Sequence, residues 1–195
     1  MALTMKRKGY GQVEPNHLSG IVTGQIYAQL PAHVKVGNTG ADSITQLEQG
    51  QFAKYDYAAG EVNFGGEGEF MLVYNEEKLY DERKQHHKDF VYKTEDFTDK
   101  LLYPRLIRTY VGDIMTTNTI AVANTSDSAE VGTMELSVGN YLTISNTGFL
   151  TLATTGEGNN ATAAVTMPST GIVWKVVKEY TMPDGQPGVK IQRVQ

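Results

Sequence analysis

The stretch from Gly112 to Ile172 contains no lysine, arginine or histidine and is rich in Thr, Ser, Asn and Gly. Short runs of alternating apolar and polar residues follow one another there, with turn residues between them: MELSV, YLTIS, FLTLA and AAVTM. Such alternation indicates strands that bury one face, and closely spaced strands with turns are typical of a small barrel or sandwich. The regularity argues against a disordered tract.

The segment TMPDGQPG lies between two further β-like runs, VWKVVKEY and VKIQRV, and predicts a hairpin. Pro183 presets φ for a turn, Asp184 can bond to the turn backbone, and Gly185 supplies the left-handed position. Pro187 and Gly188 then end the loop. We expect this rigid hairpin to close the β module and to contribute geometry rather than chemistry.

The alternation in the hairpin also predicts which side chains point into the core. Trp174, Val176 and Tyr180 are expected to face one way, together with Val189 and Ile191 on the partner strand.

The first half of the chain shows weaker β signals. The apolar run 69–75, EFMLVYN, predicts a buried strand, and LIRTYV predicts another. The charged segment 76–90 is compatible with one surface helix or with a solvated loop. Residues 1–20 are interrupted by glycines and a proline, so they are expected to form an extended arm.

Together these patterns predict a mainly β chain of β-barrel or β-sandwich modules, with short helical or loop segments and an extended N-terminal arm. The expected division is an arm over residues 1–20, a β-rich domain over 21–112 and a small β-barrel-like domain over 113–195, closed by the C-terminal hairpin. The segment 76–90 belongs to the middle part.

Composition excludes several classes of protein. The chain has 195 residues, enough to bury a real core, and no cysteine, which excludes disulfides and thiolate metal sites. Its formal net charge of −5 makes a nucleic-acid partner unexpected. No apolar window is long enough for a membrane span, and no secretory signal is expected.

No reaction centre emerges from the sequence, so we predict that the chain is not an enzyme and assign no catalytic, cofactor-binding or metal-ligating residue. His86 and His87 are adjacent and would point about 100° apart on a helix, which suits a shared metal ion poorly. The glycines of FGGEGEF precede a strand, whereas those of a phosphate loop follow one. Eleven tyrosines fit either an aromatic interface or a half-buried β core.

Three segments resemble small structural proteins of tailed bacteriophages: EVNFGGEGEFMLVYNEEKLYDERKQHHKDF, YPRLIRTYVGDIMTTNT and VWKVVKEYTMPDGQPGVKIQRV. In small decoration domains of such phages, a Gly-Asp turn and a strand are followed by a glycine turn, a strand and a valine-rich hairpin. Here VGDIMTTNT and SVGNYLTISNTGFLTLATTG are similar to that pattern, with Gly139-Asn140 in place of the more usual Gly-Asp.

The resemblance implies a capsid decoration, or cement, protein or another minor head protein. Such a protein is made in the cytoplasm of the host bacterium and lies on the capsid exterior. Its expected partners are the major capsid protein and neighbouring copies of itself, with a trimer as one expected assembly, and it needs no cofactor, nucleic acid or membrane.

The basic arm offers candidate capsid contacts at Lys6, Arg7, Lys8 and Tyr10. An arm of this kind can become ordered only on binding a neighbour, although a floppy tail is the alternative reading. We predict that deleting residues 1–15 leaves the module folded but weakens capsid binding.

Two other roles stay open at this stage. The chain could be a head–tail connector, a tail protein or a fibre base protein, and copy number in the particle separates these from a decoration protein. It could also be a carbohydrate-binding module on a host-facing appendage, with Trp174 and the tyrosines stacking on sugars.

Overall fold

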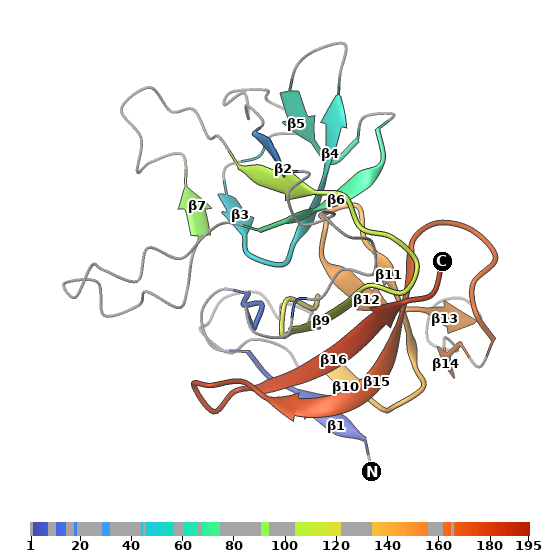
Figure 1. The fold of residues 1–195 in the computed structure, drawn as a ribbon. Coiled ribbons are helices and arrows are strands. Elements are labelled where there is room, and N and C mark those ends of the chain that lie inside the picture. The colour runs from blue at the N-terminus through green and yellow to red at the C-terminus, as the bar shows by residue number, and fades with distance from the viewer. Residues whose placement is uncertain are drawn as a thin grey trace.

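The computed structural model describes residues 2–7, 11–14, 18, 29–31, 44, 46–56, 61–65, 68–74, 91–93, 104–121, 134–155, 162–164 and 166–195. This part of the chain contains strands, turns and connecting segments, and no helix. Its strands pair antiparallel in two five-stranded sheets and three two-stranded ribbons (Figure 1). The prediction of a mainly β fold is confirmed, whereas the charged segment 76–90 lies outside the described residues.

The first sheet is built from residues that precede Gly112 and has the order β2-β8-β6-β4-β5. Strand β6 lies in its middle, and Met71, Leu72 and Val73 on this strand are fully buried. The apolar run 69–75 was therefore correctly predicted as a buried strand. The strands of this sheet are β2 (Gln29–Pro31), β4 (Phe52–Asp56), β5 (Glu61–Asn63), β6 (Phe70–Val73) and β8 (Arg105–Ile107).

The second sheet follows Gly112 and has the order β12-β11-β15-β16-β9. Its edges approach each other, because Ile120 forms an isolated parallel bridge with Leu150 and the N–H of Ala121 donates to the carbonyl of Leu150 at 2.7 Å. The described strands are thus curled but do not form a closed barrel. They are β9 (Ile114–Thr117), β11 (Tyr141–Ile144), β12 (Leu150–Leu152), β15 (Val173–Thr181) and β16 (Pro187–Arg193).

Three two-stranded ribbons complete the described strands. Strand β1 (Leu3–Met5) pairs with β10 (Met134–Leu136), and β3 (Gln46–Glu48) pairs with β7 (Val91–Lys93). The third ribbon joins β13 (Thr154–Thr155) to β14 (Thr162–Ala163). In Figure 1 the β1–β10 ribbon lies beside the hairpin of β15 and β16, so the N-terminal strand is close to the C-terminal half.

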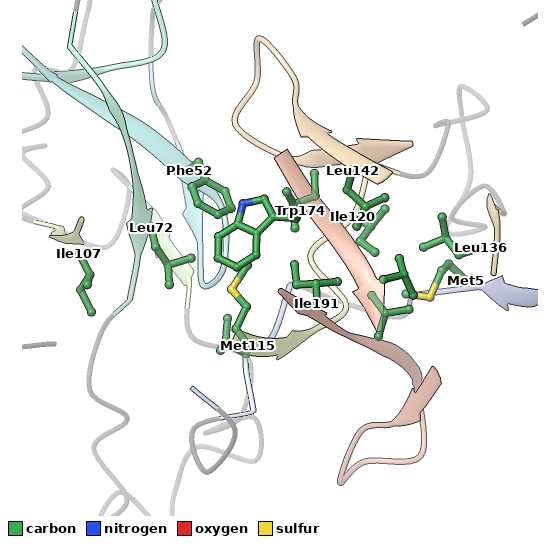
Figure 2. Close-up of a cluster of buried hydrophobic side chains, with 14 residues drawn as sticks. Met5, Phe52, Leu72, Ile107, Met115, Ile120, Leu136, Leu142, Trp174 and Ile191 are labelled. Atoms are coloured by element: carbon green, nitrogen blue, oxygen red, sulfur yellow. The ribbon is translucent and has the colours of Figure 1, made fainter. Parts of the chain in front are cut away.

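The main core joins the two large sheets. Trp174 on β15 is 1% exposed and packs against Phe52 on β4, with ring centroids 5.9 Å apart and planes at 53°. Leu72 and Ile107 join the same cluster from the first sheet (Figure 2). The predicted domain boundary at Gly112 thus coincides with the change from one sheet to the other. The hydrophobic core contains residues from both sides of this boundary, and the division into domains stays a prediction.

The N-terminal segment is extended in its backbone, but it is packed against the body of the protein. Met5 is 1% exposed within the core, and β1 completes its ribbon with β10. Farther along, Val13 bridges Thr117, and the N–H of Glu14 donates to the carbonyl of Thr116 at 2.8 Å. The expectation of an arm that orders only on binding is wrong for residues 2–7 and 11–14, because apolar burial and backbone pairing already hold them.

The C-terminal hairpin forms the turn that the sequence predicts. The N–H of Gly185 donates to the carbonyl of Met182 at 2.8 Å, and Gly185 has a φ of +83°. Asp184 accepts a hydrogen bond from the N–H of Gln186 at 3.0 Å. A type I turn followed by a left-handed glycine is a common three-residue hairpin connection, so local sequence alone specifies it.

The facing of the hairpin side chains was predicted correctly except at its distal end. Trp174, Val176, Val189 and Ile191 are all buried. A register shift between Val176 and Lys178, however, places Glu179 opposite Val189 and Tyr180 opposite Gly188. The expectation that Tyr180 faces the same way as Trp174 is wrong, because the extra residue of a bulge reverses the alternation beyond it.

Substituting Gly185 by alanine is expected to lower the free energy of unfolding by about 1 kcal/mol, since an L side chain is strained in the left-handed region. A Cβ at this position would meet no atom within 4 Å, so backbone strain accounts for the effect. Urea unfolding measures it, and Gly185→Asn serves as the control because asparagine tolerates this conformation better. Equal stability of Gly185→Ala and the unchanged protein would argue against the left-handed turn.

Candidate functional site

Two turns of the second half have the same sequence pattern and the same geometry. The first spans Tyr110 to Asp113 and leads into β9. The N–H of Tyr110 donates to Oδ2 of Asp113 at 2.7 Å, and the N–H of Asp113 donates to the carbonyl of Tyr110 at 3.1 Å. Gly112, at the third position, has a φ of +101°, as a type II turn requires.

The second turn spans Ser137 to Asn140 and leads into β11. The N–H of Ser137 donates to Oδ1 of Asn140 at 2.7 Å, and the N–H of Asn140 donates to the carbonyl of Ser137 at 3.0 Å. Gly139 has a φ of +97°. An aspartate and an asparagine therefore perform the same turn-closing role through a side-chain oxygen.

Both turns are clamped to the C-terminal hairpin by paired backbone hydrogen bonds of 2.8 Å. Gly112 donates to Arg193, whose N–H donates back to Asp113. Gly139 donates to Val176, whose N–H donates back to Asn140. One turn is thus fixed to β16 and the other to β15, so the hairpin carries two equivalent, rigid turns.

Each turn exposes a valine at its second position. Val111 is 57% exposed and Val138 is 58% exposed. The turn geometry does not select valine there, since proline is the residue that type II turns favour at this position. Tyr110 is 40% exposed beside Val111, and Val177, at the bulge next to the clamped Val176, is 36% exposed. We call these four side chains at the two turns and the adjoining bulge, Tyr110, Val111, Val138 and Val177, the turn surface.

Arg193, whose backbone is bonded to the first of these turns, forms a charged group with Glu69 and Arg108. Arg108 Nε lies 3.3 Å from Oε2 of Glu69, and Arg193 Nη1 lies 3.7 Å from Oε1 of the same carboxylate. Arg193 also donates to the carbonyl and to the hydroxyl of Thr109. Burial lowers the pKa of Arg193 from its ordinary value, with Glu69 opposing the shift. Exposed apolar side chains near a charged group, as at the first turn, are typical of protein–protein interfaces.

The structure separates the predicted capsid contacts. Lys6 is exposed, whereas the Arg7 side chain is 13% exposed and its Nη1 lies 2.9 Å from Oε2 of Glu48. The Arg7 guanidinium also lies over the ring of Phe149, 5.4 Å from its centroid. Arg7 is therefore an internal anchor in this structure. Lys8 and Tyr10 lie outside the described residues.

The predicted structural turn lies at the end of the hairpin. Pro183, Asp184 and Gly185 are exposed, while Gly188 is buried on β16. Asp184 Oδ2 also accepts a hydrogen bond from Nε2 of Gln12 at 3.0 Å, which ties the turn to the N-terminal segment. The turn therefore has a structural role in holding that segment.

The described residues contain no group of three or more His, Asp or Glu side chains arranged to hold a metal ion. Within the same part of the chain, no helix is long and apolar enough to cross a membrane. His86 and His87 lie outside it. The suggestion that Trp174 stacks on sugars is wrong, because its ring is buried in the core.

The turn surface was missed by the sequence analysis, although a signal was present. The strings YVGDI and SVGNY share a Val-Gly-Asx pattern directly before a strand. Their common attachment to one hairpin is a tertiary feature that no local pattern reveals.

Comparison of the chain with models of protein families, with curated proteins and with solved structures found no match.

Proposed function

We propose that the chain is a structural virion protein that binds the outer surface of a phage capsid and stabilises contacts between major capsid protein subunits. The turn surface is the observation that carries the proposal. Two equivalent turns, fixed to one hairpin, present an exposed valine each. Two matched contact points on one rigid element suit a protein that joins two neighbouring copies of the same subunit.

The sequence resemblance to phage decoration proteins supplies the expected partner. A shell is stabilised by many repeated contacts, so each one can be small, provided that the contacting groups are held rigidly. Clamped turns meet this requirement because little conformational freedom is lost on binding. Contacts with neighbouring copies of the chain on the shell are part of the same proposal.

Binding to assembled shells tests the proposal through the two valines. Val111→Asp and Val138→Asp are each expected to weaken binding about tenfold or more, because a charge replaces an apolar contact at the interface. Co-sedimentation with purified shells of the cognate major capsid protein measures the effect.

Met167→Asp is the matched control, since Met167 is 44% exposed but lies outside the turn surface. It is expected to bind like the unchanged protein. Thermal unfolding should be unaltered in all three variants, because the substituted side chains are exposed. Unchanged binding of both valine variants would reject the turn surface as the capsid contact.

A further inference from the structure

A pocket of about 400 Å³ is lined by Arg7 of the N-terminal segment, by residues of β3 and the turn after it, and by residues of the segments that follow β9 and β11. Its polar side is formed by Arg7, Gln46, Glu48, Gln51 and the exposed Thr147. A second, apolar side is formed by Phe149 with Ile120 and Ala121. The volume falls at the small end of the range that ligand pockets in proteins occupy.

The polar side of the pocket is held in place by internal hydrogen bonds. Glu48 Oε2 accepts from the N–H of Gly11 at 2.6 Å, and its Oε1 accepts from Nε2 of Gln46 at 3.2 Å. Gln51 accepts from the N–H of Glu48 at 2.9 Å and donates to the carbonyl of Thr147 at 2.6 Å. The side chains are therefore held in place before any ligand arrives, which lowers the entropic cost of binding.

Some hydrogen-bonding capacity remains unused within the described part of the chain. The Nε and Nη1 atoms of Arg7 are buried, whereas its Nη2 is not among the buried atoms and forms no hydrogen bond or ion pair with a described residue. Gln46 donates through Nε2, and its Oε1 accepts no hydrogen bond from a described residue. The pocket thus offers a donor and an acceptor from two different elements.

The charges of the pocket indicate what kind of ligand fits. Arg7 and Glu48 are its ionisable residues, and they neutralise each other at 2.9 Å. An anion would meet the carboxylate, and a cation would meet the guanidinium. A hydroxyl group both donates and accepts hydrogen bonds, so it can pair with the donor of Arg7 and the acceptor of Gln46 without adding a charge to the pocket.

We propose that this pocket binds a neutral, hydroxyl-rich ligand of the size of a monosaccharide. The hydroxyl groups of the sugar bond to Arg7 and Gln46, and its C–H face packs against Phe149 and Ile120. This inference is independent of the capsid proposal, since the turn surface has no residue in the pocket.

Solution NMR of the ¹⁵N-labelled full chain tests the proposal with glucose, galactose, mannose, N-acetylglucosamine and rhamnose. At least one sugar is expected to shift the amide resonances of Gln46, Gln51 and Phe149, with a Kd on the order of 1 mM. No shift with any of the sugars would overturn the proposal, as would shifts caused by acetate or phosphate but by none of the sugars.

Gln46→Ala and Phe149→Leu are expected to weaken sugar binding about tenfold, because each removes one ligand contact. Lys190→Ala, on the outer face of β16, is the control and should bind as before. If Phe149→Leu unfolds, the binding of sugar to Gln46→Ala alone tests the proposal, because this substitution removes only one long internal hydrogen bond. Undiminished sugar binding by Gln46→Ala would contradict the proposed sugar site. Capsid binding is measured separately by co-sedimentation with shells, so failure of one proposal can be distinguished from failure of the other.

Discussion

Replacing Trp174 by alanine is expected to lower the free energy of unfolding by about 3–5 kcal/mol, the usual cost of truncating a fully buried aromatic side chain. Trp174 is 1% exposed and contacts Phe52 from the other sheet. Residues of both sheets pack around the Trp174 side chain (Figure 2). Neither sheet can shift to fill the cavity that alanine would leave without losing its own packing.

Trp174→Phe is the matched variant. It keeps an aromatic ring and also removes an indole N–H that is buried without an acceptor among the described residues. The loss is therefore expected to be smaller, about 1–2 kcal/mol. Urea unfolding monitored by circular dichroism measures the free energy of unfolding of both variants. Tryptophan fluorescence cannot be used, because Trp174 is the single tryptophan of the chain. Nearly equal stability of Trp174→Ala and the unchanged protein would mean that the two sheets do not share a core.

Replacing Arg7 by alanine is expected to lower the free energy of unfolding by about 3 kcal/mol, because it leaves a buried carboxylate without its cation. Glu48 is 5% exposed and pairs with Arg7 at 2.9 Å. The substitution also removes the guanidinium from the ring of Phe149. The N-terminal segment is expected to detach more readily as a result.

The neighbouring Lys6→Ala is the control for this prediction. Lys6 is exposed, so its loss is expected to change stability by less than about 0.5 kcal/mol. Equal effects of the two substitutions would favour an unattached arm. Deleting residues 1–15 is accordingly expected to destabilise the module, contrary to the expectation from sequence that it stays folded.

Features that depend on neighbouring residues could be predicted from the sequence. The turn at Pro183, Asp184 and Gly185 follows from local backbone preferences, and the alternation around Trp174 and Val176 follows from the period of a strand. The buried strand β6 was recognisable from its length and apolar character in the same way.

Features that depend on contacts between distant segments could not be predicted. From the sequence Arg7 is expected to be a surface cation, because only the fold brings Glu48 beside it. The scattered glycines and the proline of the first twenty residues predict an irregular arm and give no sign of the strand β1. The orientation of Tyr180 depends on a bulge, and the bulge has no clear signature in VWKVVKEY. The two Val-Gly-Asx turns are visible in the sequence, but their equivalence depends on the hairpin that holds both.

The number of copies of the chain in purified virions tests the proposed function most directly, and quantitative mass spectrometry can measure it against the major capsid protein. A protein that joins neighbouring capsid subunits should be present on the order of hundreds of copies, following the symmetry of the shell, whereas a connector ring holds about a dozen. We predict the higher number; a dozen copies would favour the connector, and absence from the particle would contradict a structural role in the virion altogether.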